Sequence, residues 1–193
     1  RSAWMGDNWD KAKVRGTPMN TGDGHQMATA LGAQFYGLAE GCHATPMDLH
    51  MADFGGLHLP AAERNNYRKI CYFLGVMLNA DGNRFVDEGE NFRNYTYAQF
   101  GKAVLDLPGH FAWQVFDDKV TDLLYAEYSF HDAHFVEAHT LEELCQKLDG
   151  IDPTDALATL NAFNDAVNDD VAFDPTVLRS EEHTSELQSP MYL

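Results

Sequence analysis

The stretch from Asn79 to Gly101 constrains the fold of this chain more than any other part of the sequence. It follows the run Cys71–Leu78, which is short and rich in large apolar residues, as is typical of a buried strand. Asp81-Gly82 predicts a tight turn, because both residues tolerate positive φ. A return strand is expected from Arg84 to Val86. The stretch therefore predicts a β-hairpin over residues 70–86.

An acidic cluster ends the expected hairpin, and one arginine, Arg93, comes directly after it. A helix is predicted from Tyr95 to Leu107, because Phe100, Val104 and Leu105 recur at helical spacing. The arginine is either a partner in a surface ion pair, since such pairs are common and weak, or a functional residue that the acids orient. The cluster consists of Asp87, Glu88 and Glu90.

Strands and helices mix along the rest of the chain without a regular βαβ rhythm, which predicts an α+β fold. Thr140 with Glu143 forms a capping-box signal, and Asp152-Pro153 is a typical helix start. Helices are expected at Gly24–Leu31, Lys119–Tyr125, Thr140–Leu148 and Asp152–Asn168, with a helical turn within Ala61–Lys69. Strands are expected at Gln34–Ala39, Phe111–Phe116 and Phe135–Ala138, and a loop at Gly41–Pro60.

Composition excludes several classes of protein. Apolar residues make up 45% of the 193 residues, so the chain is not compositionally disordered. A formal net charge of −17 argues against a nucleic-acid partner, which needs a basic surface. No apolar run has transmembrane length. Cys42, Cys71 and Cys145 form no CxxC motif and are expected to be small buried residues, which favours a reducing, cytoplasmic compartment.

Two short motifs precede the organising stretch. Thr21-Gly22-Asp23-Gly24 stands where a loop becomes a helix, so Asp23 is expected to cap that helix. His43 lies in a loop, where a histidine is usually exposed or hydrogen-bonded locally. Three further histidines, His131, His134 and His139, match no standard zinc spacing, so no metal site is predicted.

The segment Asn79–Arg93 resembles part of the fumarate reductase/succinate dehydrogenase flavoprotein family, which reads N-x-x-G-x-R-F-x-x-E and then an arginine. The longer run through RNYTYAQFGKAVLDLPG is most similar to the tricarballylate dehydrogenase branch of that family. The resemblance extends over roughly Thr17 to Pro175. The TGDG motif and the histidine motif fall in the order in which the family has them.

The resemblance implies a role for each motif. Thr21, Gly22, Asp23 and Gly24 would contact FAD, and His43 would hydrogen-bond a substrate carboxylate. Arg93 would be the catalytic arginine, which takes a proton while the neighbouring carbon gives hydride to the flavin N5. The match needs one inserted residue before the proline that follows His43 and one after Glu88.

The sequence departs from the family where a Thr-Glu pair is expected, because Tyr67 and Arg68 stand there instead. Arg68, with Arg64 and Lys69, would offer uncompensated cations near the site. Arginine binds carboxylates bidentately, so Arg68 is a candidate for a further carboxylate of a tricarboxylic acid. A solvated basic patch is the alternative.

We therefore expect an internal fragment of an FAD-dependent dehydrogenase that converts tricarballylate to cis-aconitate. Its partners would be a di- or tricarboxylate and an unidentified electron acceptor. Residues 1–40 would end an FAD-binding segment, residues 41–178 would form a capping (substrate) domain, and residues 179–193 resemble a translated sequencing adapter. The alternative is a non-catalytic acidic α+β binding module. A G-x-G-x-x-G motif after an upstream strand would favour the enzyme.

Overall fold

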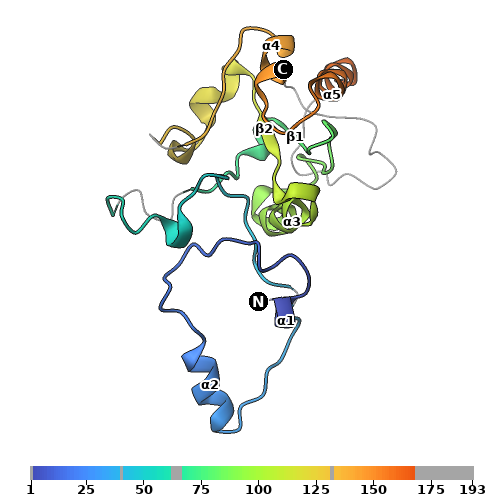
Figure 1. The fold of residues 1–193 in the computed structure, drawn as a ribbon. Helices are drawn as coiled ribbons and strands as arrows, with labels where there is room; N and C mark the ends of the chain where they lie inside the picture. The colour runs from blue at the N-terminus through green and yellow to red at the C-terminus, as the bar shows by residue number, and fades with distance from the viewer. Residues whose placement is uncertain (1, 40, 62–66, 131–132, 168–193) are drawn as a thin grey trace.

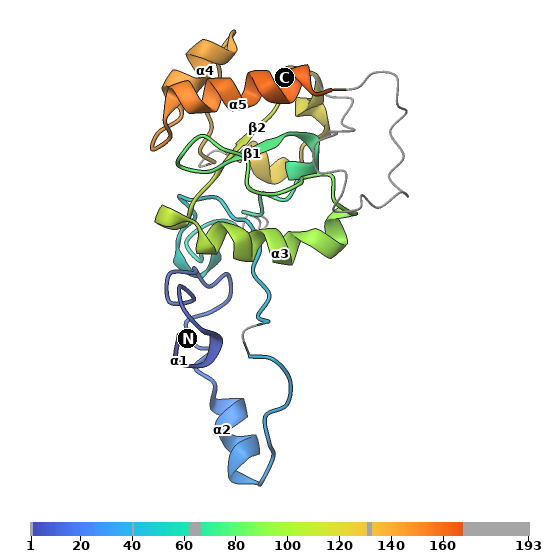
Figure 2. The same ribbon diagram turned by 90° about the vertical axis from the view of Figure 1, so that its right-hand side faces the viewer.

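The structure is a computed structural model that describes residues 2–39, 41–61, 67–130 and 133–167. An N-terminal arm, residues 2–39, carries the helices α1 (Ser2–Met5) and α2 (Asp23–Ala30) and projects from the rest of the chain (Figures 1 and 2). The rest, called the body, is residues 41–167. Its helices and small sheet are consistent with the predicted α+β class.

The sheet has two antiparallel strands, β1 (Val76–Leu78) and β2 (Trp113–Val115), with Met77 opposite Gln114. The predicted hairpin partner for β1 was wrong, because the segment after the turn makes only an isolated bridge between Leu78 and Arg84. On that side the Met77 N–H donates to the Glu88 carboxylate at 2.6 Å. A side chain thus occupies the place of the expected return strand.

The predicted turn at Asp81-Gly82 is confirmed. The side-chain oxygen of Asn79 accepts the N–H groups of Asp81 and Asn83 at 3.0 and 2.9 Å. Gly82 has φ +73°, and a Cβ there would lie 2.4 Å from the backbone nitrogen of Ala156. Glycine is therefore required both by the turn and by its close approach to the last helix.

Helix α3 (Arg93–Asp106) begins two residues before the predicted start and ends at Leu107, just before Pro108. Phe100 and Leu105 are buried, as their spacing predicts. Phe100 packs in a cluster with Ile70, Tyr72 and Met77. The helix therefore lies against the segment that leads into β1.

Two capped helices, α4 (Leu141–Lys147) and α5 (Pro153–Asp165), cover the sheet. The Thr140 hydroxyl accepts the Glu143 N–H at 3.2 Å, and the Asp152 carboxylate accepts the first amides of α5. Both predicted helix starts are confirmed, while residue 168 lies outside the described part. The buried cluster between the helices and the sheet consists of Val76, Leu78, Val115, Cys145, Leu148, Ile151, Ala156, Leu160 and Phe163.

Three predicted segments take other forms. Residues 34–39 are not a strand, because they lie in the arm without a partner strand, and Tyr36 is fully exposed. Residues 135–138 also lack strand structure. A 3-10 helix, η4 (Asp118–Leu123), replaces the predicted helix at 119–125. Further 3-10 turns are η1 (Asp53–Gly55), η2 (Tyr72–Leu74), η3 (Pro108–His110) and η5 (Ala126–Tyr128).

The three cysteines are free, and two of them, Cys71 and Cys145, are buried as expected. Cys42 is exposed, so that part of the prediction was wrong. Its position next to the junction of arm and body explains this, since the chain there has no secondary structure.

Candidate functional site

Arg93 is the first residue of α3 and is partly buried. Its guanidinium carbon lies 5.5 Å from the centre of the Tyr125 ring, and its Nη2 donates to Asn94 Oδ1 at 2.8 Å. Tyr72 donates a long hydrogen bond, 3.4 Å, to the Arg93 carbonyl. The guanidinium therefore lies between the start of α3 and the segment that joins η4 to η5.

The acidic cluster that precedes Arg93 is engaged elsewhere. Glu88 is buried and pairs with Arg84. The Asp87 carboxylate accepts the Gly89 N–H at 3.0 Å, and Glu90 accepts from Gln99 at 3.4 Å. Among the ion pairs of the described residues, none joins Arg93 to these acids. The arginine is therefore not held in the simple surface pair that was one reading of the sequence.

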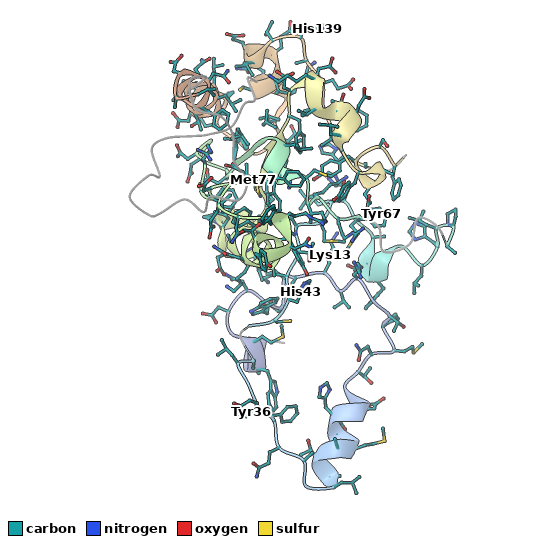
Figure 3. All side chains as sticks on the ribbon, turned by 180° about the vertical axis from the view of Figure 1, so that it is seen from behind. Lys13, Tyr36, His43, Tyr67, Met77 and His139 are labelled. Carbon is teal, nitrogen blue, oxygen red and sulfur yellow. The ribbon has the colours of Figure 1, made fainter. Side chains whose placement is uncertain are left out.

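His43 lies beside the same helix, where the arm meets the body (Figure 3). Its Nε2 is 2.6 Å from the Tyr97 hydroxyl, and the two rings meet edge to face at 4.8 Å. Tyr97 is one helical turn after Arg93, so both side chains leave α3 on the same face. The structure thus brings His43 to the face of α3 that carries Arg93.

A close backbone approach holds the His43 segment on α3. A Cβ placed on Gly101 would lie 2.6 Å from both the Ala44 carbonyl carbon and the Thr45 nitrogen. Arg93, Tyr97 and Gly101 are spaced by four residues and so follow one another along that face. The chain after His43 crosses α3 at the point where the helix lacks a side chain.

Arg68 is paired rather than free. Its Nη2 lies 2.7 Å from Glu127 Oε1, and the two side chains are 37% and 10% exposed. Its Nε is buried and has no hydrogen-bond partner in the part of the chain that the structure describes. Lys69 is 3.3 Å from Asp48 and donates to the Glu127 carbonyl at 2.8 Å. The expectation of uncompensated cations was wrong for Arg68 and Lys69, because residues distant in sequence supply carboxylates. Arg64 lies outside the described residues.

Cys71 lies close enough to Glu127 and Arg93 for both charges to act on its thiol. Burial raises the pKa of the Cys71 thiol, the Glu127 carboxylate raises it further, and Arg93 opposes the shift. Glu127 is itself buried, at 8% exposure. Glu127, which pairs with Arg68, and Arg93 therefore lie near the same buried thiol.

Sequence reasoning missed both Glu127 and Tyr97. Tyr97 belongs to the run RNYTYAQFGKAVLDLPG and stands one helical turn after Arg93. Its position on the predicted helix could therefore have indicated that it lies beside Arg93. Glu127 lies in a 3-10 turn, 59 residues from Arg68, and its local sequence has no comparable signal.

Asp23 is the first residue of α2, as expected for a helix N-terminus. It is not the cap: Gly22 occupies that position in a left-handed conformation, φ +89°, and no side chain caps the helix. A Cβ on Gly22 would meet no atom within 4 Å, so the space around this turn is open. Because the first amides of a helix have no intrahelical acceptor, this turn can receive an anionic group.

The structure does not bring this turn together with His43 and Arg93. In both ribbon views α2 lies toward the far end of the arm, away from α3. None of the residues of α2 is buried. The TGDG motif therefore presents an open surface separate from the face of α3.

A cavity of about 310 Å³ lies elsewhere, between the arm and the loop that contains η1. The cavity is lined by Asp10, Lys11, Ala12, Lys13, Val14, Asp53 and Phe54.

Within the described ranges, no group of three His, Cys, Asp or Glu side chains could hold a metal ion, and His131 falls outside those ranges. Of the described helices, none is long and apolar enough to cross a membrane.

Comparison with known proteins gives a partial match. Over 93 residues the chain is 37% identical to a protein described as NADH:fumarate oxidoreductase from Klebsiella pneumoniae (strain 342). The match covers 48% of this chain but only 9% of that protein's length. No family model matches the chain. The similarity supports a likeness to fumarate reductase-like oxidoreductases.

Proposed function

We propose that this chain is part of an FAD-dependent oxidoreductase that dehydrogenates a CH–CH bond of a di- or tricarboxylic acid. The observation that carries the proposal is the arrangement at α3, where His43 contacts Tyr97, one helical turn after Arg93. The partial similarity to a fumarate oxidoreductase adds support.

In this proposal His43 donates a hydrogen bond to a substrate carboxylate and so orients the substrate. Arg93 accepts the proton that leaves the substrate carbon. An arginine needs a carboxylate relay for this task, because its pKa in water is above 12. Glu127 is the carboxylate we propose for the relay, because it is buried and Arg93 lies over the ring of Tyr125, two residues before it. To serve as the relay, Glu127 must release its pair with Arg68.

The residues at the start of α2 fit a contact with FAD. Gly22 leaves open space, the N-terminal amides are not capped by a side chain, and the helix dipole favours a phosphate at this end. Thr21, Gly22, Asp23 and Gly24 would hold the cofactor. FAD, when bound, supplies the acceptor for the substrate hydride at N5.

The finer proposal is that the substrate is tricarballylate and that Arg68 binds its additional carboxylate. The pair with Glu127 sets the conditions for this, since Arg68 must either leave Glu127 for the substrate carboxylate or bind both carboxylates at once. Its Nε has no hydrogen-bond partner among the described residues and can donate to an incoming carboxylate only after the side chain moves toward solvent.

The test of the enzyme proposal uses the full-length protein that contains this chain. It should show a flavin absorption spectrum and oxidise tricarballylate or succinate with a dye as acceptor. Arg93→Lys should lower kcat by about a hundredfold or more, the range for loss of a general acid or base. Lys102→Ala, on an exposed turn of the same helix, is the matched control. A protein without flavin or turnover would instead be the acidic binding module.

The substrate proposal has a separate test. Arg68→Ala should lower kcat/KM for tricarballylate by an amount that corresponds to about 2 kcal/mol, the value of a hydrogen bond to a charged group. Turnover of succinate should change much less. Equal losses for both acids would mean that Arg68 contributes to the fold through Glu127 rather than to substrate choice.

A further inference from the structure

The contact between His43 and Tyr97 points to a residue with a defined task. We propose that Tyr97 is a positioning residue, which fixes the ring of His43 so that one nitrogen faces a substrate carboxylate. The inference rests on the proposed function, because it deepens the role of His43 at the same site.

The two residues differ in how firmly they are held. His43 lies in a segment without secondary structure, and its side chain is exposed. Tyr97 lies in the middle of α3, and its ring packs against the buried cluster that contains Tyr72 and Phe100. The tyrosine hydroxyl is therefore a fixed point, and the 2.6 Å contact transfers that position to the imidazole.

Gly101 completes the arrangement from the backbone side. The Ala44 and Thr45 backbone passes so close to Gly101 that a Cβ would overlap it at 2.6 Å. This approach places the main chain after His43, and the tyrosine places its ring. Functional side chains need such supporting contacts, because a displacement of about 1 Å at a site can abolish productive binding.

The proposed role also requires one tautomer of His43. A neutral imidazole has one nitrogen that donates and one that accepts, and the partner of the first nitrogen decides which is which. If the Tyr97 hydroxyl donates to Nε2, the proton resides on Nδ1. A carboxylate only accepts hydrogen bonds, so this arrangement is the one that leaves a donor for it. Tyr97 thus converts a histidine of free orientation into a directed N–H donor.

The experiment measures binding of malonate, an unreactive dicarboxylate, to the full-length protein by calorimetry, together with kcat and KM. Tyr97→Phe keeps the packed ring and removes the hydroxyl. It should raise the malonate Kd about fivefold, the value of one ordinary hydrogen bond, and raise KM more than it lowers kcat. Tyr95→Phe, at a position that is 73% exposed on the same helix, should change neither.

A double-mutant cycle shows whether Tyr97 acts through His43. In a His43→Ala background the Tyr97→Phe substitution should have no further effect on the malonate Kd, because the ring it positions is gone. If the effects of the two substitutions on the malonate Kd are fully additive, the positioning role is overturned. It is also overturned if the wild type binds malonate and Tyr97→Phe binds it with the same Kd. A wild type that binds flavin but neither malonate nor substrate would overturn the proposed function, and the role of Tyr97 with it.

Discussion

Gly101 decides where the His43 segment lies on α3. Glycine in a helix costs up to about 1 kcal/mol relative to alanine, so a sequence that places it in mid-helix needs a compensating contact. The compensation is the backbone of Ala44 and Thr45, which approaches where any Cβ would stand. The absence of a side chain at Gly101 therefore allows the segment that carries His43 to lie against the helix that begins with Arg93.

Replacing Gly101 with alanine tests that approach. Overlap at 2.6 Å should cost about 1–3 kcal/mol, as overpacking of a well-packed site does, and should exceed the gain in helix propensity. The free energy of unfolding, measured with urea, should therefore fall. Gly16→Ala is the control, because a Cβ there meets only the end of the Val14 side chain at 4.0 Å. Equal stability of the two variants would contradict the close approach.

The burial of Tyr72 predicts how the stability of the fold depends on pH. Burial raises the pKa of Tyr72 to about 12, although its hydrogen bond with Thr96 and the charge of Arg93 oppose the shift. The folded state therefore retains a proton that the unfolded state releases near pH 10. The stability contributed by this group is present below pH 10 and is lost as the pH rises toward 12.

The measurement is urea unfolding of the chain at pH 8, 10 and 11.5. Tyr72→Phe should be less stable than the wild type at pH 8, by about 1 kcal/mol for the lost hydrogen bond. It should also lose less stability than the wild type between pH 10 and 11.5. Tyr95→Phe should follow the wild type, because Tyr95 is exposed. Parallel curves for Tyr72→Phe and the wild type would contradict the assignment.

Strand β1 is stabilised on its two edges by different groups. On one edge it pairs with β2, and on the other its central amide donates to the carboxylate of Glu88. Glu88 is 4% exposed and is paired with Arg84, four residues earlier. This side chain therefore satisfies a buried donor that a third strand would otherwise pair.

Replacing Glu88 with glutamine tests this arrangement. The variant retains an acceptor for Met77 but leaves Arg84 without its carboxylate in a partly buried position. Breaking such a pair costs about 3 kcal/mol, and the free energy of unfolding should fall by that order. Asp106→Asn removes an exposed pair with Lys102 on α3 and should cost less than about 1 kcal/mol. A loss for Glu88→Gln as small as for Asp106→Asn would show that the fold does not depend on the pair between Glu88 and Arg84.

The arm and the body differ in how their side chains are covered. Trp9 is buried, and Lys13 donates to the carbonyl groups of Leu49 and Met51, so these residues attach the arm. Beyond them the arm is exposed, and α2 has no buried residue. Large apolar side chains that are at least 59% exposed there are Met19, Met27, Leu31, Phe35, Tyr36 and Leu38.

Limited proteolysis should report this difference. Chymotrypsin at low concentration should cut first after Phe35 or Tyr36, because few contacts protect that part of the backbone. The body should persist as a large fragment, which mass spectrometry identifies by its new N-terminus. Initial cleavage after Tyr72 or Phe100, which are buried, would contradict the division into arm and body.

The sequence by itself determined the features whose signals lie within one helical turn. The starts of α4 and α5, the turn at Asp81-Gly82 and the end of α3 were predicted from neighbouring residues. Caps and turns are local, because a side chain satisfies amides two or three residues away. The motif order predicted His43 and Arg93 as site residues, and that assignment stays a prediction.

Only the tertiary structure decided which segments meet. It paired β1 with β2 instead of the chain after the turn, joined His43 to Tyr97 across 54 residues, and joined Arg68 to Glu127 across 59. Apolar periodicity shows that a surface is buried but not which surface covers it, and a charge in the sequence does not identify its partner. Those choices depend on packing and on burial of the whole chain, which no local pattern contains.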